Sequence, residues 1–147
     1  MTDYIWLRGE KEPFGDVTLV SEGAREVVVT LKGVKKTIPA SEVRALWHGD
    51  APGDLDHALR RMEKGDFRAA EKLLEPFEKR EGWLRAHAGY HRANARRLRA
   101  ELEGTGHDEA LALLKAWRER EGDHWLAPLA AIATGDAAIL QKDYDLA

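Results

Sequence analysis

Residues 49–53, "GDAPG", divide the sequence into two parts of different composition. A proline and two glycines within five residues interrupt regular secondary structure. Before them, apolar and polar residues alternate, whereas the residues after them are rich in Ala, Leu, Glu and Arg, the strong helix formers. We therefore predict a domain boundary here, between a β domain over residues 1–49 and a helical domain over residues 53–147.

Five short strands are predicted before this boundary. Val17, Leu19, Val27, Val29 and Leu31 recur at alternate positions, which is the two-residue period of strands buried on one face. Fewer than fifty residues cannot supply two layered sheets, so we expect a bent antiparallel sheet that closes into a small barrel. The predicted strands lie near residues 3–8, 15–21, 25–32, 34–38 and 43–48.

The segment "TIPASEVRALW", residues 37–47, adds a detail to the barrel. A strand is expected to end at Ile38, a tight turn to follow at Pro39, and the apolar pattern to resume at Val43. This order of elements resembles SH3-like and Sm-like barrels, in which a short helical turn precedes the last strand. The resemblance covers residues 3–48 and implies a five-stranded barrel, so the expected fold class is α+β.

Two short helices are predicted directly after the boundary. Asp54 is expected to cap the first and Gly65 to end it, and Asp66 is expected to cap the second. Helices joined by two or three residues lie antiparallel, each covering the apolar side of the other. Their apolar positions are Leu55, Ala58, Leu59 and Met62 in the first helix, and Phe67, Ala70, Leu74 and Phe77 in the second.

The second of these helices has a counterpart forty residues later. Residues 70–77, "AEKLLEPF", align without a gap with residues 110–117, "ALALLKAW". The first stretch leads to "KREG", ending at Gly82, and the second to "EREG", ending at Gly122. Periods of this length are typical of arrays of stacked hairpins. Gly65 and Ala70, with Gly135 of "ATGDAAILQKDYDLA", resemble the tetratricopeptide family, which implies a tetratricopeptide-like array of antiparallel hairpins that binds protein segments. A long middle helix near residues 83–102 and Lys142 at the position of a glycine depart from the family pattern.

The last hairpin of this array is predicted to be incomplete. Residues 144–147 are interpreted as the first turn of a second helix, preceded by a first helix over residues 125–140. Trp125, Leu129, Ile132 and Leu140 would then lie on a helix with an uncovered apolar face. Because exposed apolar surface associates, we expect possible self-association through this C-terminal helix.

Composition excludes several classes of protein. The chain of 147 residues has a net charge of -3 and no cysteine, so disulfides, cysteine catalysis and thiolate metal sites are excluded. Neither a membrane-spanning run nor a signal-peptide pattern is present, which favours a cytoplasmic protein without membrane contact. No nucleotide-binding motif or catalytic triad pattern occurs, and we therefore predict no enzymatic activity and no cofactor.

The segment "HAGYH" is the best metal-binding candidate. His87 and His91 are four residues apart on a predicted helix, where both imidazoles could reach one zinc ion. A metalloprotease would have Glu where this chain has Ala88, and no third ligand is evident. His91 also lies on the apolar side of the helix, which favours a core histidine, so we predict no metal site.

The same helix carries the strongest charge asymmetry in the chain. Residues 83–102 contain five arginines and one acid, whereas the chain from Glu103 onward contains nine acids and four bases. The favoured interpretation is a helix face paired with acids of neighbouring units. Alternatively, the face binds an acidic peptide or, less favourably, RNA, since arginine pairs with carboxylates and phosphates and tyrosine stacks on bases. The candidate binding residues are Arg85, Tyr90, Arg92, Arg96 and Arg99.

Two functions follow from these observations. The first is a non-catalytic protein-interaction scaffold that uses the surface of the helical array to bind a protein or an acidic peptide. The alternative is an RNA-binding protein that uses the small barrel and the Arg-rich helix over residues 83–102. The barrel contains seven bases and eight acids, which argues against phosphate affinity there and favours the scaffold.

Overall fold

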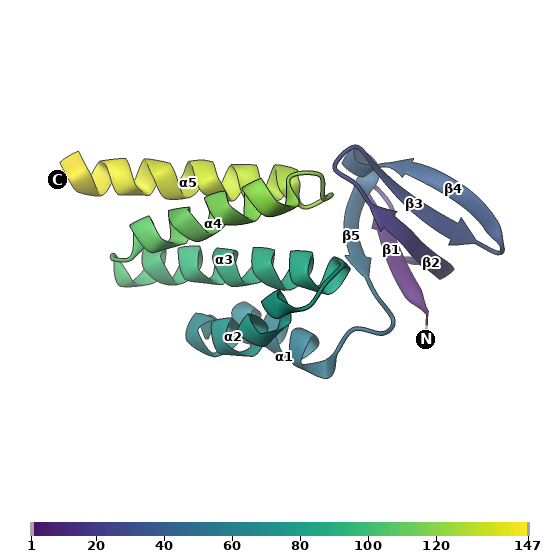
Figure 1. The fold of residues 1–147 in the computed structure, drawn as a ribbon, viewed down its shortest axis with the longest axis horizontal. Coiled ribbons are helices and arrows are strands. Elements are labelled where there is room, and N and C mark those ends of the chain that lie inside the picture. Colours follow the sequence, from purple (N-terminus) through teal and green to yellow (C-terminus); the bar gives the residue numbers. More distant parts are fainter. Residues whose placement is uncertain (1, 147) are drawn as a thin grey trace. The chain divides into compact units, whose positions relative to one another are not determined.

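The structure is a computed structural model that describes the backbone of residues 2–146 and the side chains of residues 2–141 (Figure 1). The described chain forms two compact units. The β unit contains the chain up to Ala51 together with Asp123–Trp125, and the helical unit contains Pro52–Gly122 and the chain from Leu126 onward. The first division falls inside the predicted boundary at residues 49–53. The expected α+β class is confirmed.

The β unit is a five-stranded antiparallel sheet in the order β4-β3-β2-β1-β5. The predicted strands agree with the observed ones to within a residue or two. Apolar residues at alternate positions, such as Val27 and Val29, point into the core, which is why the two-residue period located them. The strands are β1 (Asp3–Leu7), β2 (Phe14–Glu22), β3 (Glu26–Leu31), β4 (Val34–Pro39) and β5 (Val43–Trp47).

A short 3-10 turn, η1 (Ala40–Glu42), curls this sheet. It joins β4 to β5, which are the two edge strands. Four residue steps span at most about 14 Å, whereas the edges of a flat five-stranded sheet lie about 19 Å apart. The sheet must therefore bend strongly, and the predicted turn before the last strand is present. Its backbone is bonded on both sides, through Arg8 N to Glu42 O at 2.8 Å and Ala40 N to Arg25 O at 2.8 Å.

A distant segment, Asp123–Trp125, completes the β unit at the end of β2. Gly23 and His124 form an antiparallel bridge, and the carbonyl of Glu22 accepts from the backbone N–H of Trp125 at 3.3 Å. The Glu22 carboxylate also accepts from His124 Nε2 at 2.7 Å and from Trp125 Nε1 at 3.1 Å. The sequence analysis did not predict this contact and placed Trp125 in a helix instead.

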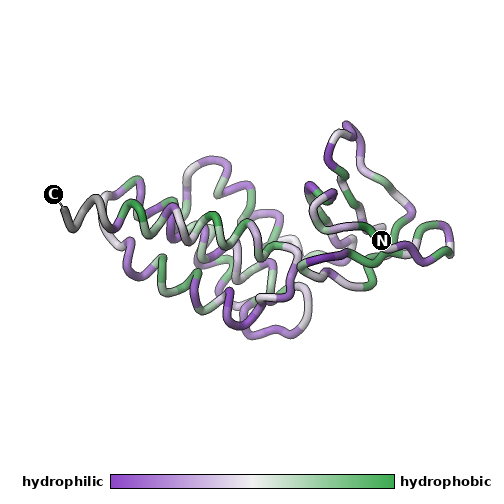
Figure 2. The backbone as a smooth tube through the Cα atoms, turned by 90° about the horizontal axis from the view of Figure 1, so that it is seen from above, coloured by the Kyte–Doolittle hydropathy of each residue, from purple (hydrophilic) through white to green (hydrophobic). Residues whose placement is uncertain are grey.

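The helical unit contains five α-helices and one 3-10 segment. Each helix packs against the next one along the chain, and α3 also contacts α5, so that α3, α4 and α5 run side by side (Figure 1). Hydrophobic and hydrophilic stretches alternate along the helices, as amphipathic packing requires (Figure 2). The elements are α1 (Gly53–Glu63), α2 (Phe67–Leu74), η2 (Glu75–Lys79), α3 (Trp83–Glu103), α4 (His107–Glu121) and α5 (Ala127–Leu146).

The predicted connection between α1 and α2 is confirmed, with one correction. Gly65 adopts a positive φ of 79° after α1, and the Asp66 carboxylate accepts from Ala69 N at 3.3 Å as the cap of α2. Asp54 does not cap α1, because the helix already begins at Gly53 with Pro52 at the N-cap position. Asp54 lies instead in the first turn, where its charge interacts favourably with the helix dipole.

The aligned stretches occupy equivalent positions in the helical unit. Ala70, Leu74 and Phe77 are buried, and so are Ala110, Leu114 and Trp117 at the corresponding positions. In the first stretch, Pro76 is accompanied by a change from α2 to η2, since proline cannot donate the next helical hydrogen bond. The detailed resemblance to tetratricopeptide repeats, and that of the β unit to SH3-like or Sm-like barrels, remain predictions.

The predicted incomplete hairpin is wrong over the described residues. α5 runs without interruption from Ala127 to Leu146, so residues 141–143 form no turn and residues 144–146 start no new helix. No glycine or proline occurs there to stop the helix. Ala147 lies outside the described residues. None of the described helices is long and apolar enough to cross a membrane.

Candidate functional site

The predicted arginine face of α3 is paired with glutamates from three other elements. Arg85 Nε donates to Glu121 of α4 at 2.7 Å, and Arg92 pairs with Glu78 of η2. Arg96 and Arg99 both donate to Glu71 of α2, at 2.5 and 2.7 Å. Arg96 also pairs with Glu109 of α4. The structure therefore supports the favoured interpretation, in which the face joins neighbouring helices.

Glu71 is the centre of this arrangement. It is only 6% exposed, and each of its oxygens accepts from a different arginine. A buried carboxylate needs such partners, because loss of hydration is otherwise uncompensated. The hydrogen bond to Glu71 is the largest cause of the raised pKa of Arg96. The hydrogen bonds to Glu71 tie α2 to α3.

A shallow hollow of about 200 Å³ lies over the same residues. Five bases and two acids line it, but several of the bases already hold carboxylates. An acidic ligand would have to compete with these internal partners for the same guanidinium groups. The lining residues are Arg68, Glu71, Lys72, Glu75, Arg92, Arg96 and Arg99.

Tyr90 does not fit the predicted role of a base-stacking residue. It is 9% exposed, and its ring packs edge-on against Trp117, with centroids 5.8 Å apart, and against His91 at 5.2 Å. Burial raises the pKa of its hydroxyl. The predicted binding role of Tyr90 is corrected to a core role between α3 and α4, because the apolar side of α3 carries it inward.

His87 and His91 lie on the inner side of α3. The ring of His87 packs edge-on against Trp83 at 5.5 Å. Burial, and secondly the charge of His87, lower the pKa of His91 to about 3. In the described part of the chain, His91 belongs to no group of three converging histidine or acidic side chains. The two residues therefore do not form the core of a three-ligand site with each other.

The outer face of α5 exposes several large apolar side chains. Ile132 and Ile139 are 63% and 61% exposed, and Leu129 is 39% exposed. The opposite side of the helix is buried against α3 and α4 through alanines such as Ala133 and Ala137. We define the α5 outer face as the exposed residues Pro128, Leu129, Ala131, Ile132, Gly135, Asp136 and Ile139.

Only some of the residues predicted to lie on the uncovered apolar face are exposed in the structure. Leu129 and Ile132 are exposed as expected, whereas Trp125 is 8% exposed and Leu140 is half-buried. Trp125 is buried because it belongs to the segment that is hydrogen-bonded to β2. Ile139, which the sequence analysis did not single out, lies seven residues after Ile132 and therefore on the same side of the helix.

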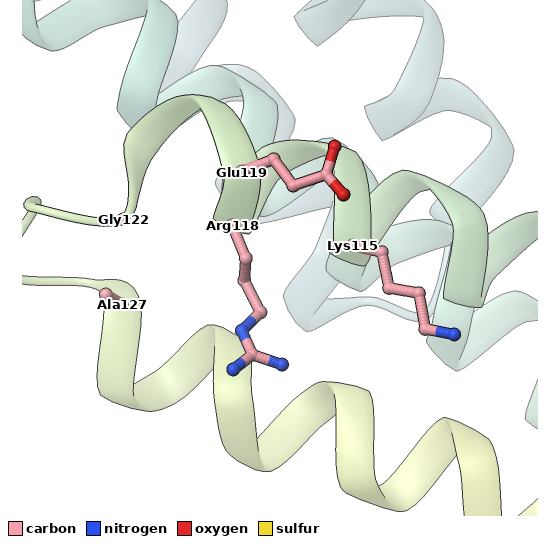
Figure 3. A pocket seen from close by; sticks show the side chains of 5 residues that line it. All are labelled: Lys115, Arg118, Glu119, Gly122 and Ala127. Atoms are coloured by element: carbon pink, nitrogen blue, oxygen red, sulfur yellow. The ribbon is translucent and has the colours of Figure 1, made fainter.

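A groove of about 400 Å³ borders this face along α4 (Figure 3). Lys115 and Arg118 line it and extend toward α5, with Glu119, Gly122 and Ala127 completing the wall. Within the described residues, neither Lys115 nor Arg118 forms an ion pair. Sequence reasoning missed both bases, although their offset from the buried positions Leu114 and Trp117 indicates that they face outward.

Comparison with protein-family models, with curated proteins and with solved structures gave no match.

Proposed function

We propose that the chain is a non-catalytic protein-interaction module that binds an acidic amphipathic helix of a partner on the α5 outer face. The observation that carries the proposal is the row of exposed Leu129, Ile132 and Ile139 beside Lys115 and Arg118, which form no ion pair with any side chain the structure describes. A contiguous apolar patch with a charged border is typical of a protein-binding surface.

The spacing of the apolar residues favours a helical partner. Leu129, Ile132 and Ile139 follow the three-and-four spacing by which one helix packs along another. Ala131 and Gly135 lie beside them and leave room for a close approach of the partner backbone. Full burial of each isoleucine contributes about 1.5–3 kcal/mol, somewhat less here because both are already partly covered.

The charges at the border favour an acidic partner. Lys115 and Arg118 lie on the α4 side of the face, where carboxylates of a docked helix would meet them. On the α3 side, Asp136 is 4.0 Å from Arg97, so its charge is partly compensated within the chain. Two bases and one acid, Glu119, line the groove, so its net charge is positive, and charge complementarity selects acidic side chains along one edge of the partner.

The RNA-binding alternative has less support. The arginines that would hold phosphates hold glutamates, and Tyr90, which would stack on a base, is buried. A nucleic acid would also find no compensating interaction on the exposed isoleucines of α5. We therefore retain protein binding as the proposed function.

Two synthetic helical peptides test the proposal. Both present leucines at the spacing of the α5 row, and one carries glutamates along one edge where the other carries lysines. Fluorescence anisotropy with the full chain should show binding of the acidic peptide and at least tenfold weaker binding of the basic one. Ile132→Asn and Ile139→Asn, and separately the pair Lys115→Glu and Arg118→Glu, should each weaken binding at least tenfold.

The matched controls are an exposed leucine and an exposed base outside the α5 outer face. Leu102→Asn and Lys72→Glu should leave binding unchanged, and all variants should keep the stability of the parent within about 0.5 kcal/mol. Binding that depends on Lys72 rather than on Lys115 and Arg118 would contradict the proposal. So would a homodimer, seen by sedimentation equilibrium, that Ile132→Asn dissociates, because the face would then accept a second copy instead.

A further inference from the structure

Three metal-ligating side chains converge at one end of the β unit. Asp3 begins β1, and His48 and Asp50 follow β5, the strand that pairs with β1. One carboxylate or imidazole atom from each residue lies within 4.8 Å of the other two. Bonds of about 2.0–2.2 Å to a shared ion hold such ligand atoms about 3–4 Å apart. The three ligand atoms therefore need to move only slightly closer together to bind one ion.

The scaffold holds Asp3 and His48 rigidly. Asp3 Oδ2 accepts from Leu19 N at 2.8 Å, and Oδ1 accepts from Gly49 N at 2.7 Å. Each carboxylate oxygen has two lone pairs, so both bonds are compatible with an ion at the same carboxylate. His48 is 8% exposed, and its Nε2 is bonded to the carboxylate of Glu22. A carboxylate on the far nitrogen is the arrangement that orients histidine ligands in metal sites.

The local charge also favours a cation. Asp3 and Asp50 lie beside the His48 imidazole, and Glu22 is bonded to His48 and also to His124. In the described part of the chain, no Lys or Arg forms an ion pair with Asp3 or Asp50. A divalent cation would neutralise the half-buried Asp3 and the exposed Asp50 beside the buried imidazole of His48.

We propose that Asp3, His48 and Asp50 bind one divalent transition-metal ion, with His48 contributing Nδ1 and Glu22 acting as its positioning residue. One nitrogen and two carboxylate oxygens are a ligand set that suits zinc and neighbouring first-row ions, with water completing the coordination. The ion would join the start of β1 to the end of β5. It is a structural site in the β unit, independent of the protein-binding face on α5.

Calorimetric titration of the untagged, chelator-treated full chain with Zn²⁺ tests this site, and Co²⁺ absorption reports the ligand geometry. We expect one ion per chain, and a melting temperature higher by about 5–10 °C at an ion concentration one hundred times Kd. Asp50→Asn, which changes an exposed side chain, should weaken binding at least tenfold, as should His48→Gln. Glu22→Gln should keep the stoichiometry and weaken binding by about 10–100-fold.

Asp54→Asn and His57→Gln are the matched controls, because they remove an acid and a histidine outside the cluster. Both should bind Zn²⁺ like the parent. If His48→Gln does not fold, the Zn²⁺ affinities of Asp50→Asn and Asp54→Asn are sufficient to test the site. Equal affinity of Asp50→Asn and the parent, or the absence of Zn²⁺ binding in the parent, would overturn the proposal.

Discussion

α3 and α5 are helices of nearly equal length, 21 and 20 residues, with opposite relations between composition and exposure. α3 is rich in arginine, yet it lies between α2 and α4 and its charged groups meet carboxylates of those helices. From residue 127 to residue 141, α5 carries a single charged residue, Asp136, and yet presents a broad apolar face to solvent. In this molecule, the helix with many charged residues makes internal contacts, whereas the helix with an apolar outer face exposes that face to solvent.

The physical basis of this difference is the length of the arginine side chain. Its aliphatic stem packs along a helix while the guanidinium reaches an acid on the next element. Five arginines can therefore lie between packed helices, provided that each meets a carboxylate. Alanine, which dominates the inner side of α5, instead allows close backbone approach and leaves the larger residues for the outside.

The largest effect is expected when the internal pairing of α3 is broken. Glu71→Ala leaves Arg96 and Arg99 without their buried acceptor, which should lower the free energy of unfolding by about 3 kcal/mol. Urea denaturation followed by circular dichroism measures the loss. Arg68→Ala removes an exposed partner of Glu103 on the same side and should cost less than about 1 kcal/mol. Equal effects of the two variants would contradict the role of Glu71.

A methyl group on the inner side of α3 should have the next largest effect. A Cβ at Gly89 would lie 2.9 Å from Trp117 Cδ1, and that buried ring is held by a 2.8 Å bond from Nε1 to Ala86 O. Because the ring cannot move aside without losing this bond, Gly89→Ala should destabilise the chain by about 1–2 kcal/mol. A thermal melt that is unchanged or raised would show that α3 and α4 are packed less closely.

The stability of the chain should also depend on pH through a histidine of α3, His91. The pKa of His91 is lowered to about 3 in the folded chain, whereas an unfolded histidine has its ordinary value near 6.5. Above pH 6.5 the His91 imidazole is neutral in both the folded and the unfolded chain, and its contribution to the free energy of unfolding is fully present. As the pH falls below 6.5, only the unfolded state binds the proton, so stability falls.

By pH 5.5 this loss should reach about 1 kcal/mol. His91→Gln should remove that part of the pH dependence, whereas His57→Gln, which changes an exposed histidine, should not. Urea midpoints at pH 7 and pH 5.5 measure the difference between the variants. An identical pH dependence in His91→Gln and the parent would show that the imidazole is protonated in the folded chain.

The smallest effect should have the opposite sign. Gly135 lies on the exposed side of α5, and a Cβ there would meet no atom within 4 Å. Gly135→Ala should therefore stabilise the chain by about 0.5–1 kcal/mol through helix propensity alone. The same substitution thus lowers stability at Gly89 and raises it at Gly135. Thermal unfolding of the two variants side by side checks the change of sign.

Local patterns predicted the elements well. Strand positions followed from the alternation of residues such as Val27 and Val29, and the turn between α1 and α2 followed from Gly65 and Asp66. These signals act over a few residues, so the sequence contains them directly. The break predicted after Leu140 was wrong because Asp143, a residue that often caps a helix, can also continue one.

Partners distant in the sequence could not be predicted in the same way. Whether Arg96 meets a peptide or Glu71 depends on how α2 lies along α3, which no local pattern specifies. The cluster of Asp3, His48 and Asp50 likewise requires the pairing of β1 with β5. Lys115 and Arg118 differ, because a helical projection of α4 alone would have shown that they face outward.

The contact of Asp123–Trp125 with β2 has a consequence for the order of folding. Glu22 bonds to residues 102 and 103 positions further along the chain. Long-range closure is slow and costs entropy that grows with the length of the intervening loop. The helices of the helical unit contact mainly their sequential neighbours, so we expect them to form early. The β unit comes first in the chain, but it acquires its last hydrogen bonds only after Trp125 has been synthesised.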